Sequence, residues 1–525
     1  MSRVLVAEKI APGGLQMLRE AGHEVVDLAG APREKLLAEL ADADALLVRS
    51  ATQVDAALLE AAPRLTVVGR AGVGVDNVDV PAASARGVLV LNSPTGNVVS
   101  AVEHTFAVLL ALLRRVPEAS ASMAAGKWEK AKFLGSELSG KTVGIVGLGQ
   151  VGSRVASRAR AFEARLLGHD PYLPLEKAQE MGVPLVPLET LLAQSDVVTL
   201  HSTATDKGRP LLGAEEFARM KPTAVLVNVA RGSLVDRAAL YDALANGRLA
   251  GAALDVFDPE PPDPQDPLLR LPNVVATPHL GASTVEAQER VSIQTVEALL
   301  EALAGAPYVP AVNLPFRGPK DSDGASGWMR LAERTAHFLS LVSRDRLSRL
   351  AVETWGLPED LLRPVAVAAV KGALETQTPE TVNYVNALYM AQDRGLSVSE
   401  TRHEDPGNYA RSLRVTVSGP KRAATADATL FAGRDARVVA VDGLPLEFRP
   451  EGTVVFLRNR DVPGVVGSVG TLLGEAGVNI ANFSLARGHG NQAAAVIAVD
   501  SAPPENVLER LRQTAAVEEV RVVSW

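Results

Sequence analysis

Three closely spaced glycines are the first residues of this sequence whose types and spacing suggest chemistry. Gly147, Gly149 and Gly152 stand in GxGxxG spacing at the end of an apolar run, residues 143–148. In this pattern the first glycine permits a tight turn, the second lets the backbone approach a pyrophosphate, and the third lets a helix pack on the preceding strand. The free N–H groups at the start of that helix then bind phosphate. The spacing therefore predicts a dinucleotide site.

An acidic residue follows the glycines at the distance that such a site requires. Asp170 ends a second apolar run, residues 164–168, close to the expected spacing of about 20 residues after the last glycine. A carboxylate there binds the ribose hydroxyls and repels a 2′-phosphate, and its neighbours His169, Pro171 and Tyr172 include no arginine to receive one. The predicted cofactor is therefore NAD rather than NADP.

Three further side chains form a candidate catalytic set. Arg231, Glu260 and His279 each lie at or just beyond the carboxyl end of an apolar run. A guanidinium binds a carboxylate and polarises a carbonyl, whereas a carboxylate beside an imidazole raises the imidazole's pKa and holds its protonated form. Such a histidine acts as an acid when a ketone is reduced and as a base when an alcohol is oxidised. Behind a dinucleotide fold, the set predicts a dehydrogenase.

Composition excludes several other classes of function. The chain has 525 residues, enough for three or four domains, with 47% apolar and 22% charged residues. Its net charge of −8 gives no support for nucleic-acid or membrane-surface binding. The absence of cysteine excludes disulfides, thiolate metal sites and cysteine nucleophiles, and we expect no metal. The first residues do not resemble a signal peptide, so the expected location is cytoplasmic.

The elements that must position these residues alternate between strand and helix. Residues 1–97 contain five short apolar runs separated by helical segments, and the alternation resumes over residues 141–282, which indicates two parallel sheets covered by helices. We expect a helix at 283–304 to return the chain to the first lobe. The prediction is a Rossmann-type cofactor domain, 98–282, inserted in a flavodoxin-like substrate domain, 1–97 and 283–314, with the site in the cleft between them.

The second half of the chain reads differently. A linker rich in Gly, Pro, Lys and Asp is expected at 315–327, followed by helices at 361–374 and 381–394 and by strands near 411–418, 428–432 and 437–441. This α+β domain, 315–450, carries no recognisable chemistry. Residues 451–525 read strand, helix, strand, strand, helix, strand, which is the order of a ferredoxin-like unit.

The motifs around the candidate residues resemble a known family. The glycine turn, NVARGSLVD, ALDVFDPEPP and TPHLGAST resemble the D-isomer-specific 2-hydroxyacid dehydrogenases over about residues 1–310, and segments 69–79 and 92–105 resemble the D-3-phosphoglycerate dehydrogenases within that family. The middle and C-terminal regions resemble the intervening and ACT regulatory domains of the long form. The resemblance implies NAD-dependent oxidation of 3-phospho-D-glycerate to 3-phosphohydroxypyruvate, the entry to serine biosynthesis.

The resemblance also implies roles for individual residues. By their positions in the matching motifs, Arg231, Glu260 and His279 are catalytic. Beside the three glycines, the residues implied at the NAD site are Val73, Gln150, Val151, Asp170, Ser202, Val229, Ala230, Arg231, Asp255, His279 and Gly281. Residues 202–213 depart from the family's pattern, which usually has a proline soon after the strand and then an acid-Thr-x-Gly turn.

The substrate argument follows from charge. 3-Phosphoglycerate carries a carboxylate at one end and a phosphate at the other, so its selection needs a second cationic pole besides Arg231. Arg49 and Arg70 end successive strands of the substrate domain and match the family's phosphate-binding positions. The backbone of Val73 and Gly74 is expected to meet the carboxylate beside Arg231, with His279 at the reacting carbon.

The C-terminal unit is expected to bind an effector. Asp461, in the first loop, and Asn479, on the next strand, are placed to receive the ammonium or hydroxyl of L-serine, while the helix N-terminus between them receives its carboxylate. Two such units should close one site by pairing through the edge of strand 453–458 or the adjoining helix, which predicts a homodimer or homotetramer. A plain dimerisation module is the alternative.

Two other functions stay open at this point. The same chemistry would serve glyoxylate, hydroxypyruvate or another 2-hydroxy acid, although the additional domains argue against such a substrate. An NAD-sensing or corepressor-like binding protein would use the same fold without turnover, and the complete Arg, Glu and His set argues against it.

Overall fold

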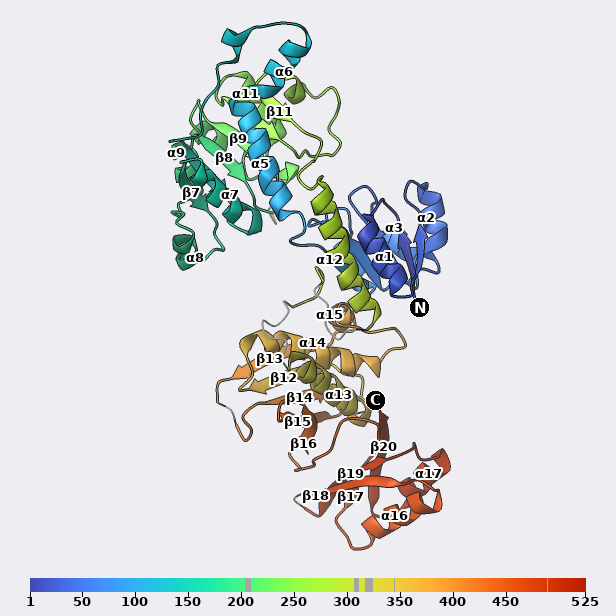
Figure 1. Ribbon diagram of the computed structural model, residues 1–525. Helices are drawn as coiled ribbons and strands as arrows, with labels where there is room; N and C mark the ends of the chain where they lie inside the picture. The colour runs from blue at the N-terminus through green and yellow to red at the C-terminus, as the bar shows by residue number, and fades with distance from the viewer. Residues whose placement is uncertain (204–208, 306–310, 317–323, 344, 406, 489) are drawn as a thin grey trace.

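The computed structural model describes residues 1–525 except 204–208, 306–310, 317–323, 344, 406 and 489. Four β-sheets follow one another along the chain and give an elongated molecule, with the two N-terminal lobes at one end and the C-terminal unit at the other (Figure 1). None of the helices within these residues is long and apolar enough to cross a bilayer.

The first sheet is parallel, with strand order β2-β1-β3-β4-β5. The strands are short, and β1, β3, β4 and β5 are mostly buried, as in a sheet covered by helices on both faces, whereas the edge strand β2 has no buried residue. Their bounds are Arg3–Val6, Glu24–Asp27, Ala45–Val48, Val67–Arg70 and Leu89–Asn92 for β1 to β5, and the helices between them are α1 (Pro12–Glu20), α2 (Arg33–Leu40), α3 (Ala56–Glu60) and α4 (Val80–Ala85).

The second sheet is also parallel, with strand order β11-β10-β9-β8-β6-β7, and it belongs to the cofactor lobe. Its strands are β6 (Thr142–Val146), β7 (Arg165–His169), β8 (Val197–Leu200), β9 (Val225–Asn228), β10 (Gly251–Leu254) and β11 (Val274–Ala276). The helices of the lobe are α5 (Val98–Leu113), α6 (Val116–Ala124), α7 (Gln150–Ala161), α8 (Leu175–Glu180), α9 (Leu188–Gln194), α10 (Ala214–Arg219) and α11 (Arg237–Ala245), with short 3-10 turns at Lys130–Phe133, Gly232–Leu234 and Pro267–Arg270.

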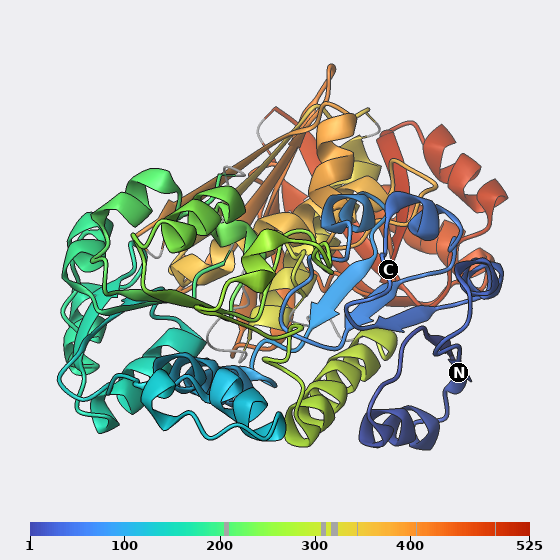
Figure 2. The ribbon, with the colours of Figure 1, turned by 90° about the horizontal axis from the view of Figure 1, so that it is seen from above.

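Helix α12 (Val285–Leu303) returns the chain to the first lobe, as predicted. Its buried face, which includes Val291, Val296 and Leu299, packs with Val4 and Leu18 into one core of the first lobe. Figure 2 shows the two lobes side by side with α12 lying between them. The cofactor lobe is therefore an insertion, and the chain crosses between the lobes at α5 and at α12.

The third region differs from its prediction in several respects. The helix predicted at 381–394 begins later, at Ala387. The expected linker at 315–327 ends earlier, because helix α13 (Ala325–Ser343) begins within it, and two strands were missed, β12 (Arg349–Trp355) and β13 (Ser397–His403). The sheet order is β13-β12-β14-β15-β16, with only β13 parallel to its neighbour. The other elements are α14 (Glu359–Glu375), α15 (Ala387–Asp393), β14 (Ser412–Ser418), β15 (Ala423–Phe431) and β16 (Asp435–Val441).

The physical reasons for these errors are local. The glycines and prolines before residue 325 obscured a helix whose buried residues recur at helical spacing, among them Trp328, Leu331, Thr335 and Leu339. Strand β13 is half-exposed and polar, so its sequence carries no alternating apolar signal.

The C-terminal unit has the predicted ferredoxin-like order. It runs β17 (Thr453–Arg460), α16 (Val465–Glu475), β18 (Ile480–Arg487), β19 (Gln492–Val499), α17 (Glu505–Gln513) and β20 (Val517–Ser524), with sheet order β18-β19-β17-β20. One expectation was wrong: strand 453–458 is no edge, because β17 lies between β19 and β20 and bonds to both. The two edges are β18 and β20.

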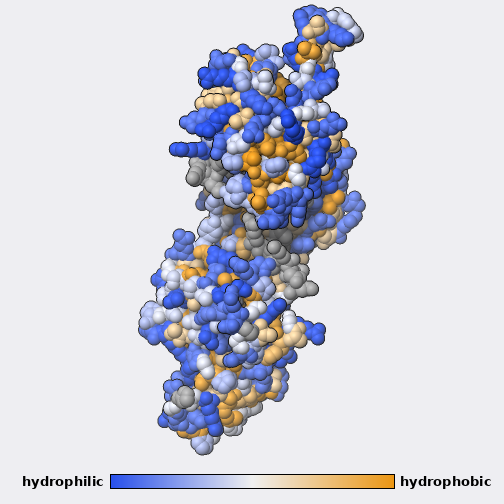
Figure 3. Space-filling model, turned by 90° about the vertical axis from the view of Figure 1, so that its left-hand side faces the viewer, coloured by the Kyte–Doolittle hydropathy of each residue, from blue (hydrophilic) through white to orange (hydrophobic). Residues whose placement is uncertain are grey.

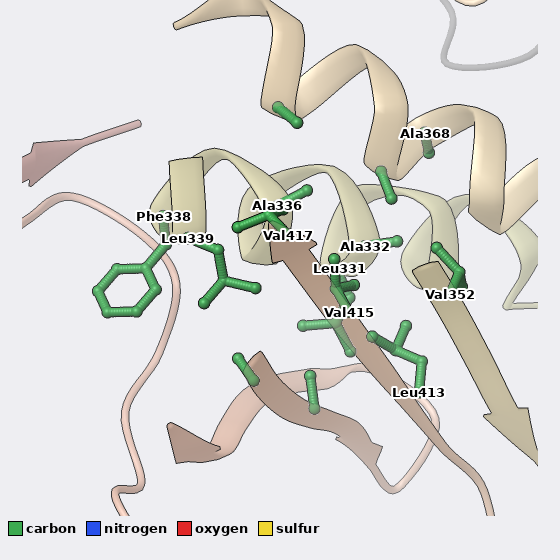
Figure 4. Close-up of a cluster of buried hydrophobic side chains, with 14 of the residues drawn as sticks. Leu331, Ala332, Ala336, Phe338, Leu339, Val352, Ala368, Leu413, Val415 and Val417 are labelled. Carbon is green, nitrogen blue, oxygen red and sulfur yellow. The ribbon is translucent and has the colours of Figure 1, made fainter. Parts of the chain in front are cut away.

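The third and fourth regions share one hydrophobic core. Helices α13 and α14 pack on the β12–β16 sheet, where Leu331, Val352 and Val415 are among the buried residues (Figure 4). The same core contains buried residues of the C-terminal sheet, namely Val454, Phe456, Ala486, Ala494, Val496 and Val523. Helices α16 and α17 pack on the other face of that sheet and form a separate core with it.

Candidate active site

A cleft of about 580 Å³ opens between the first and second sheets, at the carboxyl ends of their strands. Loops that follow β1, β3, β4 and β9 contribute its walls, as is usual for ligand sites in open α/β sheets. Seven residues selected from the sequence line this one cleft: Arg49, Arg70, Val73, Gly74, Arg231, Glu260 and His279.

The candidate acid–base pair is in contact. His279 Nδ1 lies 2.7 Å from Glu260 Oε2, and the other carboxylate oxygen accepts a hydrogen bond of 2.9 Å from the Phe257 N–H. The hydrogen bond to Glu260 raises the pKa of His279 above its usual value, although burial opposes the increase. Burial acts against ionisation of Glu260 as well, but the bonds from His279 and Phe257 outweigh it and lower the pKa of Glu260. The imidazole Nε2 stays available to a substrate.

A fully buried carboxylate holds the segment that carries His279. Asp255 accepts hydrogen bonds from the Thr277 hydroxyl at 2.6 Å, the Leu280 N–H at 2.7 Å and the Gly281 N–H at 2.8 Å. His104 Nε2 lies 3.1 Å from the same carboxylate. His279 has a φ of 55°, a left-handed conformation that non-glycine residues rarely adopt, and the bonds of Asp255 to the next two residues support it.

Arg231 follows β9 and reaches across the cleft. Its Nε lies 3.1 Å from Asp76 Oδ2, a residue of the opposite lobe, and its Nη1 donates to the Ala230 carbonyl at 2.7 Å. A Cβ at Gly74 would lie 2.1 Å from the Arg231 Nη2, so a side chain at this position would displace the guanidinium. Gly74 and Arg231 are therefore adjacent, and Val73 lines the same cleft.

The first lobe supplies a second group of cations at the same cleft. Arg70 is the last residue of β4, and Arg49 follows β3, whose Val48 pairs with Arg70 in the sheet. Burial and the nearby Arg231 lower the pKa of Arg70 from its usual value. Its Nε is buried without a hydrogen-bond partner among the described residues. Three cations that face one cleft in this way favour an anionic ligand.

The glycine turn has the shape that a dinucleotide requires. Gly147 has a φ of 87°, and a Cβ there would meet the His201–Ser202 backbone at 2.8 Å. A Cβ at Gly152 would lie 1.9 Å from the Gly147 carbonyl oxygen, whereas a Cβ at Gly149 would meet open space. The open space at Gly149, at the start of α7, is the cradle in which a pyrophosphate can approach the N–H groups.

Residues around the turn also fit a bound nucleotide. Asp170 Oδ2 accepts a 2.9 Å hydrogen bond from the Leu148 N–H, which places the carboxylate against the turn. The Ser202 hydroxyl oxygen is buried without a partner among the described residues, so it is free to bind a ligand group. Burial lowers the pKa of the neighbouring His201 to about 4, so that this imidazole is neutral.

The remaining cofactor candidates surround the same turn and the strand ends beside it. Gln150 and Val151 begin α7, while Val229 and Ala230 follow β9. A Cβ at Gly281 would lie 3.3 Å from the side chains of Val229 and Asp255. Gly281 therefore packs closely against the residues that follow β9 and β10. Residues 204–208, in the stretch that departs from the family's pattern, lie outside the described residues.

The two effector candidates lie far along the chain, and each has another partner within the unit. Asp461 Oδ2 is 3.2 Å from Arg487 Nε, and the Asn479 amide donates to Asp500 at 2.8 Å. The N-terminus of α16 between them has no side-chain cap, so its N–H groups are available.

Several residues of the site were missed by sequence reasoning. His104, Thr277 and Asp76 act through contacts with Asp255 or Arg231, and each of them is remote in sequence from its partner. For Asp76 a signal existed, since it follows the end of β4 by six residues in the same glycine-rich loop as Gly74. His104 stands in the middle of α5, where the sequence offered no such signal.

Comparison with known proteins assigns each region. The NAD-binding domain of D-isomer-specific 2-hydroxyacid dehydrogenases matches residues 106–281, the intervening domain of D-3-phosphoglycerate dehydrogenase matches 325–442, and the ACT domain matches 453–516. Among solved structures, the TT0316 protein of Thermus thermophilus is 40% identical, with a TM-score of 0.53 over 58% of this chain and 97% of its own. D-lactate dehydrogenase from Aquifex aeolicus, solved with NAD and lactic acid, is 28% identical, with a TM-score of 0.51 over 58% of this chain and 96% of its own.

Full-length relatives extend the match to the whole chain. D-3-phosphoglycerate dehydrogenase from Archaeoglobus fulgidus is 40% identical over 97% of this chain and 97% of its own length. The protein of that name from Bacillus subtilis is 38% identical over 100% of this chain and 99% of its own. With the order of its three matched domains and this coverage, the chain belongs to the D-3-phosphoglycerate dehydrogenase family of NAD-binding 2-hydroxyacid dehydrogenases.

Proposed function

We propose that this chain is a cytoplasmic dehydrogenase that oxidises 3-phospho-D-glycerate to 3-phosphohydroxypyruvate, the first step of serine biosynthesis, with NAD as acceptor. One observation carries the proposal: the Glu260–His279 pair and Arg231 share a cleft with Arg49 and Arg70, which supply a second cationic pole. A substrate with a carboxylate and a phosphate matches this arrangement better than lactate or glycerate, which have one anionic group.

The geometry supports the following roles for the residues. His279 Nε2 takes the proton of the substrate hydroxyl, and Glu260 at Nδ1 stabilises the imidazolium that forms. Arg231 binds the substrate carboxylate and polarises the developing carbonyl, beside the backbone of Val73 and Gly74. NAD, when bound, accepts the hydride from the carbon that carries the hydroxyl. The carboxylate of Asp170 favours NAD over NADP by repelling a 2′-phosphate.

A single assay tests this proposal. NADH formation is measured with 3-phosphoglycerate, D-glycerate and D-lactate, and with NADP in place of NAD. We expect the highest kcat/KM for 3-phosphoglycerate with NAD. A higher kcat/KM for D-glycerate or D-lactate would assign another 2-hydroxy acid, and binding of NAD without turnover of any hydroxy acid would favour an NAD-sensing protein.

We also propose that the protein is a homodimer or homotetramer. Helix α6 and the segment after it stand away from the body at the top of the molecule, visible in Figures 1 and 3. No residue of α6 is buried, and several large apolar side chains of this segment are exposed, among them Met123 at 56%, Trp128 at 81% and Leu134 at 88%. Such side chains favour burial against a second copy. Light scattering of the parent and of Trp128→Ala tests this: a monomeric parent contradicts it.

The ACT unit is proposed to bind L-serine as a feedback inhibitor. The uncapped α16 N-terminus would receive the carboxylate, and Asp461 and Asn479 would bind the ammonium or hydroxyl after leaving their present partners. Because β17 is interior, the surfaces left for pairing two units are α16 and the sheet edges at β18 and β20. Calorimetry with L-serine on the parent and on Asp461→Ala is the measurement. If millimolar serine neither binds nor slows turnover of the parent, the regulatory role fails.

A further inference from the structure

Glu8, a residue without a role in the chemistry above, holds the loop that carries Arg49. It lies two residues beyond the end of β1, and β1 pairs with β3, so the carboxylate comes to rest beside the end of β3. One oxygen accepts hydrogen bonds from the N–H groups of Arg49 and Thr52, both at 2.9 Å, and the other accepts from the Ala51 N–H at 3.1 Å. An ionised carboxylate, which only accepts, complements three converging donors.

A second side chain holds the same loop through its carbonyl groups. Asn77, in the loop after β4, is buried, with 7% of its surface exposed. Its amide donates to the carbonyl oxygens of Arg49 at 2.8 Å and Thr52 at 2.7 Å. The main chain of residues 49–52 is thus bonded through its N–H groups to Glu8 and through its carbonyls to Asn77.

The charge of Glu8 has the wrong sign for direct binding of an anion. The carboxylate lies near Arg70 and favours the charged form of its guanidinium. The same negative charge weakens the electrostatic attraction between the cations of the cleft and a phosphate. Burial opposes ionisation of Glu8, yet its backbone hydrogen bonds outweigh burial and lower its pKa. The ionised Glu8 carboxylate therefore opposes phosphate binding electrostatically, so we look for its role in the structure of the loop.

We propose that Glu8 is a positioning residue for the phosphate pole: by binding the N–H groups of Arg49, Ala51 and Thr52, it sets the direction in which the Arg49 guanidinium enters the cleft. This inference rests on the proposed function, since it takes the phosphate of 3-phosphoglycerate as the ligand of Arg49. It extends that function by naming a residue that touches neither substrate nor cofactor.

The two effects of Glu8 predict opposite results for one variant. In Glu8→Gln an amide NH₂ replaces one acceptor oxygen and faces a backbone N–H, so a charge-assisted bond is lost and the loop loosens. Positioning predicts that KM for 3-phosphoglycerate rises about tenfold, with kcat and the KM for D-glycerate nearly unchanged. Through-space repulsion alone predicts that KM falls. A KM that falls or stays constant overturns the proposal.

Controls separate positioning from general damage. Glu289→Gln removes the same charge from α12 in the same lobe, outside the 49–52 loop, and should leave KM unchanged. In the Arg49→Ala background, Glu8→Gln should add little further increase, because both changes act on one contact. Additive increases of KM in the double variant overturn the assignment to Arg49.

A measurement without substrate distinguishes failure of this inference from failure of the proposed function. Hydrogen exchange of the whole protein, followed by mass spectrometry, should show faster exchange in the peptide that covers 49–52 in Glu8→Gln and not in Glu289→Gln. If the parent does not oxidise 3-phosphoglycerate, the proposed function fails. The exchange measurement still tests whether Glu8 holds the 49–52 loop, because it needs no substrate. Unchanged exchange in Glu8→Gln overturns the positioning role in either case.

Discussion

Burial by itself would lower the pKa of His279, because it disfavours the charged imidazolium. The hydrogen bond to Glu260 reverses that effect and raises the pKa. Oxidation of an alcohol needs the neutral imidazole as base, whereas reduction of a ketone needs the imidazolium as acid. The rate of oxidation should therefore increase as pH rises through the raised pKa of His279, and the rate of reduction should decrease over the same range.

Replacement of Glu260 tests this pairing. In Glu260→Gln the pKa of His279 should fall, so the midpoint of the pH profile of kcat/KM for oxidation should move to lower pH. His279→Ala should abolish turnover while NAD still binds, since the proton acceptor is lost and the nucleotide fold is not. The measurements are pH–rate profiles and NAD titration by calorimetry. An unmoved midpoint in Glu260→Gln would contradict the pairing, as would parental turnover in His279→Ala.

The two arginines of the first lobe carry a separate prediction. Arg49→Ala and Arg70→Ala should each raise KM for 3-phosphoglycerate, because loss of a charge-assisted bond costs about 1.5 to 3 kcal/mol, roughly tenfold to a hundredfold. Their preference for 3-phosphoglycerate over D-glycerate should decline accordingly. Arg64→Ala is the matched control, since Arg64 pairs with Asp44 on the exposed surface of the same lobe. If both variants retain the parent's preference, phosphate binds elsewhere.

At the scale of elements, the glycine turn between β6 and α7 contains one glycine that the packing of α7 requires and another that the bound cofactor requires. The same substitution at two of its positions should have different consequences. A Cβ at Gly152 would lie 1.9 Å from a backbone oxygen, so Gly152→Ala must displace α7 from β6 and lower stability. A Cβ at Gly149 meets open space, and its φ of −69° suits alanine, so Gly149→Ala should fold normally.

The expected contrast is therefore a loss of NAD affinity with intact stability in Gly149→Ala, and a lowered melting temperature in Gly152→Ala. Thermal unfolding and NAD titration of the two variants measure this. Undiminished NAD affinity in Gly149→Ala would place the pyrophosphate away from this turn.

At the scale of the whole molecule, the ACT unit is joined to the intervening region by more than a linker. The face of its sheet that carries Val454 and Phe456 is part of the core that α13 and α14 also fill. Trp525, next to the end of β20, donates its indole N–H to the Arg334 carbonyl of α13 at 3.1 Å. An effector bound to the ACT unit would thus act on one body that includes the intervening region, and the Asn383 amide connects that body to Gly87 of the first lobe at 2.6 Å.

Two adjacent valines of β17 test this shared core. Val454 belongs to the shared core and Val455 to the ACT unit's own core, and both have 0% exposure. Each change to alanine should cost about 2 kcal/mol of stability. Hydrogen exchange should increase in α13 for Val454→Ala but only within the ACT unit for Val455→Ala. If Val454→Ala, like Val455→Ala, increased exchange only within the ACT unit, the ACT sheet and α13 would not share a core.

Much of this protein was readable from its sequence because the signals are local. The glycine turn, the acid after the next strand and the short apolar runs follow from backbone sterics and from burial of a parallel sheet, which act over a few residues. Arg231, Glu260 and His279 could be selected as candidates for the same reason, since each follows the end of a strand. The βαββαβ order of the C-terminal unit has equally local causes.

Tertiary structure alone decided the features that depend on partners remote in sequence. The role of Asp255 as the support of His279, the contact of Asp76 with Arg231 and the hold of Glu8 and Asn77 on Arg49 each join segments from different strand ends. The interior place of β17 depended on which strands pair with it, and the core shared by the last two regions depended on which sheet face met α13. Residue types and spacing do not specify such pairings, because they depend on how separate elements pack against each other.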